Sequence, residues 1–259
     1  MHRCQPVADP SDGGEEMTLL QSAAASPLAA IDVVAFDAYG TLIDFTEPDF
    51  VATMAEICGE QGLEADAGEV WRRFVQASYQ VRAENHRRPV YRRYDEVWTA
   101  QFGLTFRRLG LFGDAQAAAI HLKRKLAQAT AFAESHVVLE TLRLHYRLAL
   151  LSNADDDFLL ECLSRNGLRF DDIVTSERAG AIKPDPAIFH YLARRLELSP
   201  ERVLHVGDGA IPDVLGAKRA GMRSAWVNRL GARRPRDVPQ PDIRVRSLRE
   251  LVPRLVRPS

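Results

Sequence analysis

The chain has 259 residues, of which 46% are hydrophobic, and a formal net charge of -1. This composition can supply a sizeable core, and it predicts no strong attraction to nucleic acid or to an anionic membrane. Three cysteines, an odd number without metal-ligand spacing, argue against a disulfide framework and favour a reducing compartment. We therefore expect a cytoplasmic protein with no nucleic-acid and no membrane partner, and the oligomeric state stays open.

Residues 1–30 are rich in Pro, Ser, Gly and Ala, and they lack the basic start and apolar centre of a signal peptide. We interpret them as a disordered tail. A second methionine, Met17, could also begin the chain.

The first predicted strand is the apolar run 31–36, which is typical of a buried strand in a parallel sheet. Asp37 follows it, at the edge where open α/β sheets bind ligands. A carboxylate there can attack phosphorus or an activated carbon and leave an ester that water cleaves. Gly40 permits a sharp turn, and Thr41 offers a hydroxyl to the transferring group. The alternative is an ordinary Asp-rich turn after a strand.

A long segment without strand pattern comes next, and its apolar residues recur at helical spacing. One of the predicted helices is Ala-rich and covers residues 115–133. We assign 48–133 to a helical cap domain, inserted into a core that comprises 31–47 and 134–259. A basic stretch of the cap, Glu84 to Tyr94, either binds a substrate carboxylate or phosphate or forms a solvated face. Its basic residues are His86, Arg87, Arg88, Arg92 and Arg93.

Further strand-like runs then alternate with helical stretches, which is the pattern of βαβ units in a parallel sheet. The predicted strands are 147–151, 172–175, 203–206, 224–227 and 242–245, the last at a sheet edge. The predicted helices are 156–166, 186–196, 212–220 and 248–255. The fold class is therefore α/β, with a Rossmann-like parallel sheet.

Two polar residues end the second strand, Ser152 and Asn153. Their side chains and the nearby backbone amides precede a helix, which is a natural place for an anion. They could equally be N-caps of that helix.

Lys183 lies in the string Lys183-Pro184-Asp185-Pro186. Pro184 keeps Lys183 extended, while Asp185 and Pro186 can begin the next helix. We expect Lys183 to point at the nucleophile and offset negative charge there, the alternative being a solvated loop lysine.

Gly207, Asp208 and Asp213 form a Gly-Asp-x4-Asp pattern after the strand 203–206. Together with Asp37 the two carboxylates supply hard oxygen ligands, which suit Mg²⁺. The structural alternative for Asp213 is a residue that begins a helix.

These four motifs, in this order and each after a strand, resemble those of the haloacid dehalogenase (HAD) superfamily of hydrolases over residues 31–256. The resemblance implies a helical cap of the first insertion type and an aspartyl-enzyme intermediate. It also implies Mg²⁺ held by Asp37, Asp208, Asp213 and the backbone carbonyl of Tyr39.

Tyr39 departs from the phosphatases of this superfamily, which carry a second Asp there to protonate the leaving oxygen and activate water. A phenol with a reference pKa of about 10 is a poor base near neutrality. Asp37-Ala38-Tyr39-Gly40-Thr41-Leu42 is more similar to the L-2-haloacid dehalogenases, whose halide leaves without a proton. The stretch around Arg72 resembles the segment whose arginine receives halide in those enzymes, although Arg72 could simply be exposed on a helix.

The fourth motif favours the phosphatases, because the dehalogenases have no carboxylate equivalent to Asp208 and use no metal. We therefore predict a Mg²⁺-dependent, phosphatase-type hydrolase of a small molecule. A metal-free 2-haloacid dehalogenase is the second hypothesis, and a catalytically idle binding module is the third. The predicted catalytic residues are Asp37, Tyr39, Ser152 and Lys183. The predicted substrate-binding residues are Thr41, Asn153 and Arg72, and the predicted metal ligands are Asp37, Tyr39, Asp208 and Asp213.

Overall fold

The computed structural model describes residues 30–85 and 91–256. Residues 1–29 of the predicted tail, and His86, Arg87 and Arg88 of the basic stretch, lie outside the described residues. Among the helices that are described, none is long and apolar enough to cross a membrane.

Six strands form one sheet in which all neighbouring strands are parallel, in the order β3-β2-β1-β4-β5-β6. The strands are β1 (Val33–Phe36), β2 (Arg147–Ser152), β3 (Asp172–Thr175), β4 (Val203–Gly207), β5 (Arg223–Val227) and β6 (Ile243–Val245). The predicted Rossmann-like parallel sheet is confirmed, and the run at 242–245 is an edge strand as expected.

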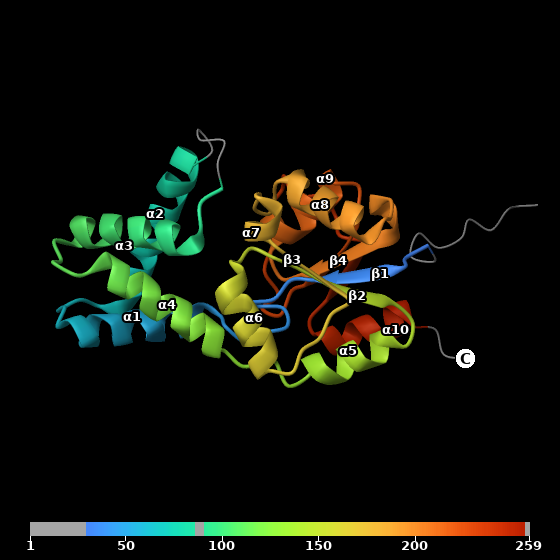
Figure 1. Cartoon of the computed structure of the whole chain (residues 1–259), viewed down its shortest axis with the longest axis horizontal. Coiled ribbons are helices and arrows are strands. Elements are labelled where there is room, and N and C mark those ends of the chain that lie inside the picture. The colour runs from blue at the N-terminus through green and yellow to red at the C-terminus, as the bar shows by residue number, and fades with distance from the viewer. Residues whose placement is uncertain (1–29, 86–90, 257–259) are drawn as a thin grey trace, which may run out of the picture.

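Helices cover both faces of the sheet, so its central strand is apolar along its whole length. Val33 and Ala35 pack into one hydrophobic cluster and Val34 and Phe36 into another, as the alternation of side chains along a strand requires. In Figure 1 one layer contains α7 (Ser176–Ala179), α8 (Pro186–Leu196) and α9 (Gly216–Arg219). The opposite layer contains α5 (Ser135–Arg143), α6 (Asp156–Arg165) and α10 (Val252–Leu255).

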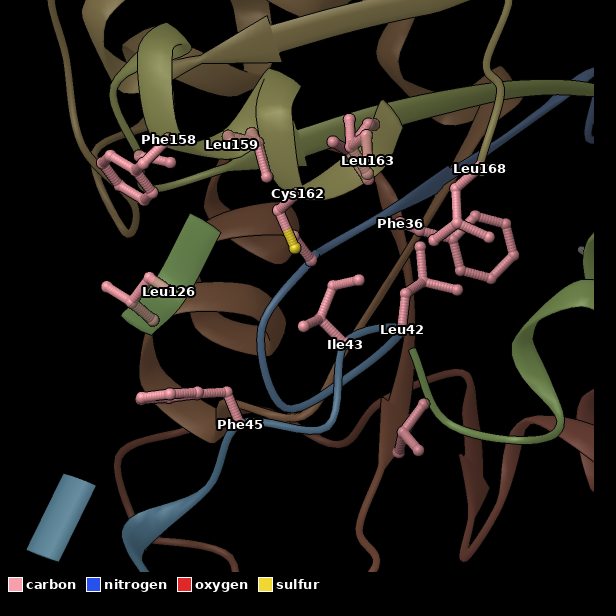
Figure 2. Packing of buried hydrophobic residues seen from close by; sticks show 14 of the residues in the cluster. Phe36, Leu42, Ile43, Phe45, Leu126, Phe158, Leu159, Cys162, Leu163 and Leu168 are labelled. Carbon is pink, nitrogen blue, oxygen red and sulfur yellow. The ribbon is translucent and has the colours of Figure 1, made fainter. Parts of the chain in front are cut away.

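Four helices between β1 and α5 form a group to one side of the sheet (Figure 1). They are α1 (Glu47–Gln61), α2 (Ala67–Asn85), α3 (Tyr94–Leu109) and α4 (Ala115–Gln128). Their apolar faces join the same hydrophobic cluster as one face of the sheet. Figure 2 shows the junction, where Leu126 of α4, Ile43 and Phe45 of the loop after β1, and Cys162 of α6 belong to this cluster. This inserted group is the helical cap.

The Ala-rich helix is shorter than predicted, because α4 ends at Gln128 and not at residue 133. The Asn166 side chain accepts from the backbone N–H of Ala131 and donates to the carbonyl of Ala129. Ala131 also forms a β-bridge with Ile43. These tertiary contacts draw the chain out of the helix although alanine favours helix.

The predicted helix over 212–220 is a π-helical turn, Ala210–Leu215, followed by the single turn of α9. The Gly209 carbonyl accepts from the N–H groups of both Asp213 and Val214. The wide turn carries the Asp213 side chain inward, so close to the backbone that a Cβ on Gly207 would lie 2.2 Å from Asp213 Cγ. The last predicted helix likewise begins as a 3₁₀ segment, Leu248–Leu251, before α10.

Candidate active site

Three neighbouring strands end at the same edge of the sheet, and each places a predicted site residue there. Asp37 follows β1, Ser152 is the last residue of β2, and Asp208 follows β4. Phe36 lies beside Leu150 on one side and Val206 on the other, so the three strand ends are nearly level. Parallel strands thus bring Asp37 together with two residues that lie more than 100 positions later in the sequence.

Lys183 binds the nucleophile candidate directly. Its Nζ donates to Asp37 Oδ1 at 2.7 Å and to Asp213 Oδ1 at 2.6 Å, and the side chain is 2% exposed. Burial opposes the charged form, but the two carboxylates outweigh it and raise the pKa of Lys183 above its usual value. As predicted, Asp185 caps α8 through the N–H of Ala187, and Pro186 is the first residue of that helix.

Asp213 is fully engaged by protein groups. Besides Lys183, its Oδ1 contacts His205 Nε2 at 2.9 Å, and its Oδ2 accepts from the N–H of Gly209 at 2.8 Å. Burial favours the neutral acid, but Lys183 and His205 prevail and hold the pKa of Asp213 well below its usual range. Asp213 therefore positions Lys183. His205, fully buried on β4, was not predicted because a histidine in an apolar strand carries no signal of its partner.

Asp208 lies at the open side of the group and is exposed to solvent. Its Oδ1 accepts from the Thr41 hydroxyl at 3.2 Å, and its backbone carbonyl accepts from Trp226 Nε1 at 2.8 Å. Gly40 has φ +84°, and a Cβ there would lie 2.7 Å from Asp208 Oδ2, so only glycine fits beside this carboxylate.

Three carboxylates therefore share one site with a single lysine. Desolvation, with repulsion from Asp213 and Asp37, raises the pKa of Asp208 to about 7. Ligand atoms of the three carboxylates lie within 4.8 Å of one another. A divalent cation bound by oxygen ligands fits this donor set, since it would balance the excess negative charge.

Lys183 binds Oδ1 of Asp37, and Thr41 binds Oδ1 of Asp208. Within the described residues, Oδ2 of each carboxylate accepts no hydrogen bond and is available to such a cation or to a substrate.

Tyr39 turns its side chain toward the cap. Its hydroxyl donates to the carbonyl of Leu126 on α4 at 3.2 Å, and its ring lies 6.1 Å from that of Phe158. Burial raises the pKa of Tyr39 well above its usual value. The phenol is therefore neutral, and its proton is already donated to the carbonyl of Leu126. Position 39 thus offers no group for general acid–base catalysis.

Ser152 and Asn153 have different surroundings. Ser152 is 2% exposed, and in the part of the chain that the structure describes its hydroxyl makes no hydrogen bond, so it can serve a ligand. Asn153 accepts from the backbone N–H of Lys183 at 2.7 Å and donates to the Lys183 carbonyl at 3.1 Å. Its amide holds the lysine backbone in place.

The structure does not bring Arg72 to this group. Arg72 lies on α2 with its side chain 62% exposed, and it pairs with Glu69 at 2.6 Å. In the basic stretch, Arg93 pairs with Asp157 and Glu177 of the core, while Arg92 lines the cavity between cap and core. The stretch therefore contributes at least one cap–core contact.

Arg229 is a further residue that the sequence did not reveal. It donates to the carbonyls of Thr41 at 2.9 Å and Gly40 at 3.4 Å, and it pairs with Glu134 at 2.7 Å. These bonds hold the loop that follows the nucleophile. Lone arginines after a strand carry no signal of such a role, because the contact spans nearly the whole core.

The family model of haloacid dehalogenase-like hydrolases matches residues 31–221. Phosphoserine phosphatase from Thermus thermophilus is 40% identical over 106 residues, which are 40% of this chain and 42% of that protein. The match thus spans less than half of the phosphatase. (S)-2-haloacid dehalogenase from Pseudomonas sp. strain YL is 28% identical over 223 residues, covering 85% of this chain and 92% of that protein.

Among solved structures, L-2-haloacid dehalogenase from Xanthobacter autotrophicus superposes with a TM-score of 0.72 at 25% identity, covering 88% of this chain and 98% of that chain. Part of the sequence is therefore similar to an enzyme named for a phosphate ester, while most of the sequence and the fold are similar to enzymes named for haloacids.

Proposed function

This chain belongs to the haloacid dehalogenase-like hydrolases, and we propose that within the family it is a Mg²⁺-dependent phosphatase of a small molecule. The observation that carries the proposal is the Asp208 carboxylate, which lies beside Asp37 and Asp213 with one lysine for all three. A haloacid dehalogenase that works without metal has no use for this third negative charge, whereas a divalent cation gives it a purpose.

The free oxygen of Asp37 attacks phosphorus, and the bond from phosphorus to the leaving oxygen breaks as that oxygen departs with the electron pair. Water then cleaves the aspartyl phosphate and regenerates the carboxylate. Lys183 holds Asp37 in orientation and offsets charge on the transferring group. The Ser152 hydroxyl is free to bind a phosphoryl oxygen, whereas the Thr41 hydroxyl orients Asp208.

Asp37, Asp208 and the backbone carbonyl of Tyr39 would hold Mg²⁺, with Asp213 acting through Lys183 or through water. The cation would neutralise the carboxylates and the phosphoryl oxygens.

Removing the cation or its exposed ligand should remove activity. Chelator should abolish phosphate release, and Asp208→Ala should raise the Mg²⁺ concentration for half-maximal rate by at least about tenfold. The measurement is a Mg²⁺ activation curve for wild type and Asp208→Ala. The matched control is Asp237→Ala, which removes an exposed carboxylate that is not among the three of the candidate metal site. An unchanged activation curve for Asp208→Ala would contradict the assignment.

Tyr39 makes the rate depend on the leaving group. General acid assistance is typically worth about 10² to 10⁴-fold, and the committed phenol cannot provide it. We expect kcat/KM to fall steeply from acetyl phosphate and 4-nitrophenyl phosphate to alkyl phosphates, and Tyr39→Asp to raise the rate on alkyl phosphates. A flat wild-type series with fast alkyl-phosphate turnover would show that another residue supplies the proton.

A 2-haloacid dehalogenase is the second candidate. Tyr39 favours it, as does the long alignment with (S)-2-haloacid dehalogenase. Carbon would then take the place of phosphorus in the attack by Asp37, and halide would leave without a proton. Halide release that resists chelator would favour this candidate over the phosphatase.

A further inference from the structure

A cavity of about 670 Å³ lies between the cap and the core, next to the nucleophile loop. The core contributes Tyr39, Asn153 and Ile182, which are close neighbours in sequence of Asp37, Ser152 and Lys183. The cap contributes most of the rest. The cavity volume is in the middle of the range of pockets for small organic ligands, about 300–1,000 Å³. It is far larger than a two- or three-carbon haloacid requires.

The lining is unusually aromatic, with nine aromatic residues among the twenty that line the cavity. Phe50 and Trp71 stack at 4.5 Å with planes 15° apart, and Phe74 continues the row beside Trp71. Phe50 and Trp71 are only half-buried, so part of their surface is open to the cavity. Rings of this kind bind other flat rings through stacked or edge contacts.

Gln101 places a polar group in the wall of this cavity. Gln101 of α3 is 4% exposed, and among the described residues its side-chain amide makes no hydrogen bond. An occupant with a polar atom of its own could form a hydrogen bond with this amide.

The chemistry at the other end of the cavity restricts the occupant further. Tyr39 lines the cavity where the cavity meets the nucleophile loop. Its hydroxyl donates its proton to the carbonyl of Leu126, so the side chain at position 39 does not protonate the leaving oxygen. Aromatic alcohols are far more acidic than alkyl alcohols, and their oxides leave without that proton. Tyr39 therefore has two effects: it occupies the position of the general acid, and it lines a cavity whose aromatic walls suit an aromatic leaving group.

We propose that the substrate is a phosphate monoester of an aromatic alcohol, whose ring system binds in this cavity; the proposal rests on the phosphatase function above. The bond from Asp37 to phosphorus forms as the bond from phosphorus to the aryl oxygen breaks. The aryl oxide leaves with the electron pair and takes its proton from water.

The test compares esters whose leaving groups match in acidity but differ in shape, with Mg²⁺ present. We expect kcat/KM for 2-naphthyl phosphate to exceed that for the phosphate of a polyfluorinated alkyl alcohol of equal acidity by about tenfold or more. Trp71→Ala should raise KM for 2-naphthyl phosphate, with a much smaller effect on acetyl phosphate, which has no ring. Phe112→Ala removes a fully exposed aromatic residue outside the cavity and serves as the matched control.

Tyr79→Ala gives a second variant if Trp71→Ala does not fold, because Tyr79 lines the cavity and is 69% exposed. Equal efficiency on the two acidity-matched esters would overturn the proposal, as would equal losses on naphthyl and acetyl phosphate in the cavity variants. Mg²⁺-dependent turnover of acetyl phosphate would still support the phosphatase function in either case. Failure to release phosphate from any ester would instead refute the phosphatase function itself.

Discussion

Asp37→Asn should fold normally and lose turnover by about 10⁴-fold or more. The amide keeps the shape of the carboxylate but is a poor nucleophile, and no other carboxylate lies directly at the end of β1. Lys183 would keep its bond to Asp213, and one of three mutually repelling charges would be removed. The free energy of unfolding should therefore be unchanged or slightly higher.

The measurement is kcat on an activated phosphate ester, together with a urea unfolding curve. Asp44→Asn is the matched control, since it makes the same change at an exposed aspartate just beyond the nucleophile loop, and its rate should equal that of wild type. A rate for Asp37→Asn above a few per cent of wild type would remove Asp37 from the role of nucleophile.

Lys183→Met should reduce both stability and activity. The substitution leaves Asp37 and Asp213 buried without their shared cation, and breaking a buried ion pair costs about 3–5 kcal/mol. Activity should fall by about 10²-fold or more, because the charge that orients the nucleophile and stabilises the transferring group is lost. Unfolding in chelator and kcat at saturating Mg²⁺ measure the two effects separately.

Lys125→Met is the control for this prediction. Lys125 pairs with Glu56 at 2.8 Å on the surface of the cap, where an ion pair contributes less than about 1 kcal/mol. We expect wild-type activity and a small loss of stability. If Lys183→Met were as stable and as active as Lys125→Met, the central ion-pair network would have no functional role.

The residues that could be placed from sequence are those that end parallel strands. Asp37 and Asp208 each follow an apolar run, and the carboxyl ends of parallel strands meet at one edge, so their proximity follows from the fold class alone. Lys183 could be placed because the two prolines beside it define a loop that leads into a helix.

Contacts that depend on tertiary packing could not be predicted from the sequence. Asn153 clamps the Lys183 backbone, and Arg229 holds the nucleophile loop from a distance of 188 residues along the chain. Neither pairing can be predicted from the spacing of residues along the sequence. Arg72 lies on the exposed side of α2, whereas its neighbour Trp71 lines the cavity, and a resemblance in sequence alone could not decide which of the two faces the site.

The end of α4 is a similar case. Alanine favours helix beyond Gln128, yet the Asn166 side chain and the bridge to Ile43 lie on elements that are distant in sequence. Local propensity is worth only tenths of a kcal/mol for each residue, so a few hydrogen bonds to the core outweigh it.

Product release from two substrates by the same enzyme preparation tests the central claim most directly. Phosphate release from 4-nitrophenyl phosphate and chloride release from 2-chloropropionate are measured side by side, each with Mg²⁺ and with chelator. A Mg²⁺-dependent phosphatase should release phosphate only when Mg²⁺ is present and should release no chloride in either condition. Chloride release that persists in chelator, without phosphate release in Mg²⁺, would contradict the account and identify the enzyme as a haloacid dehalogenase.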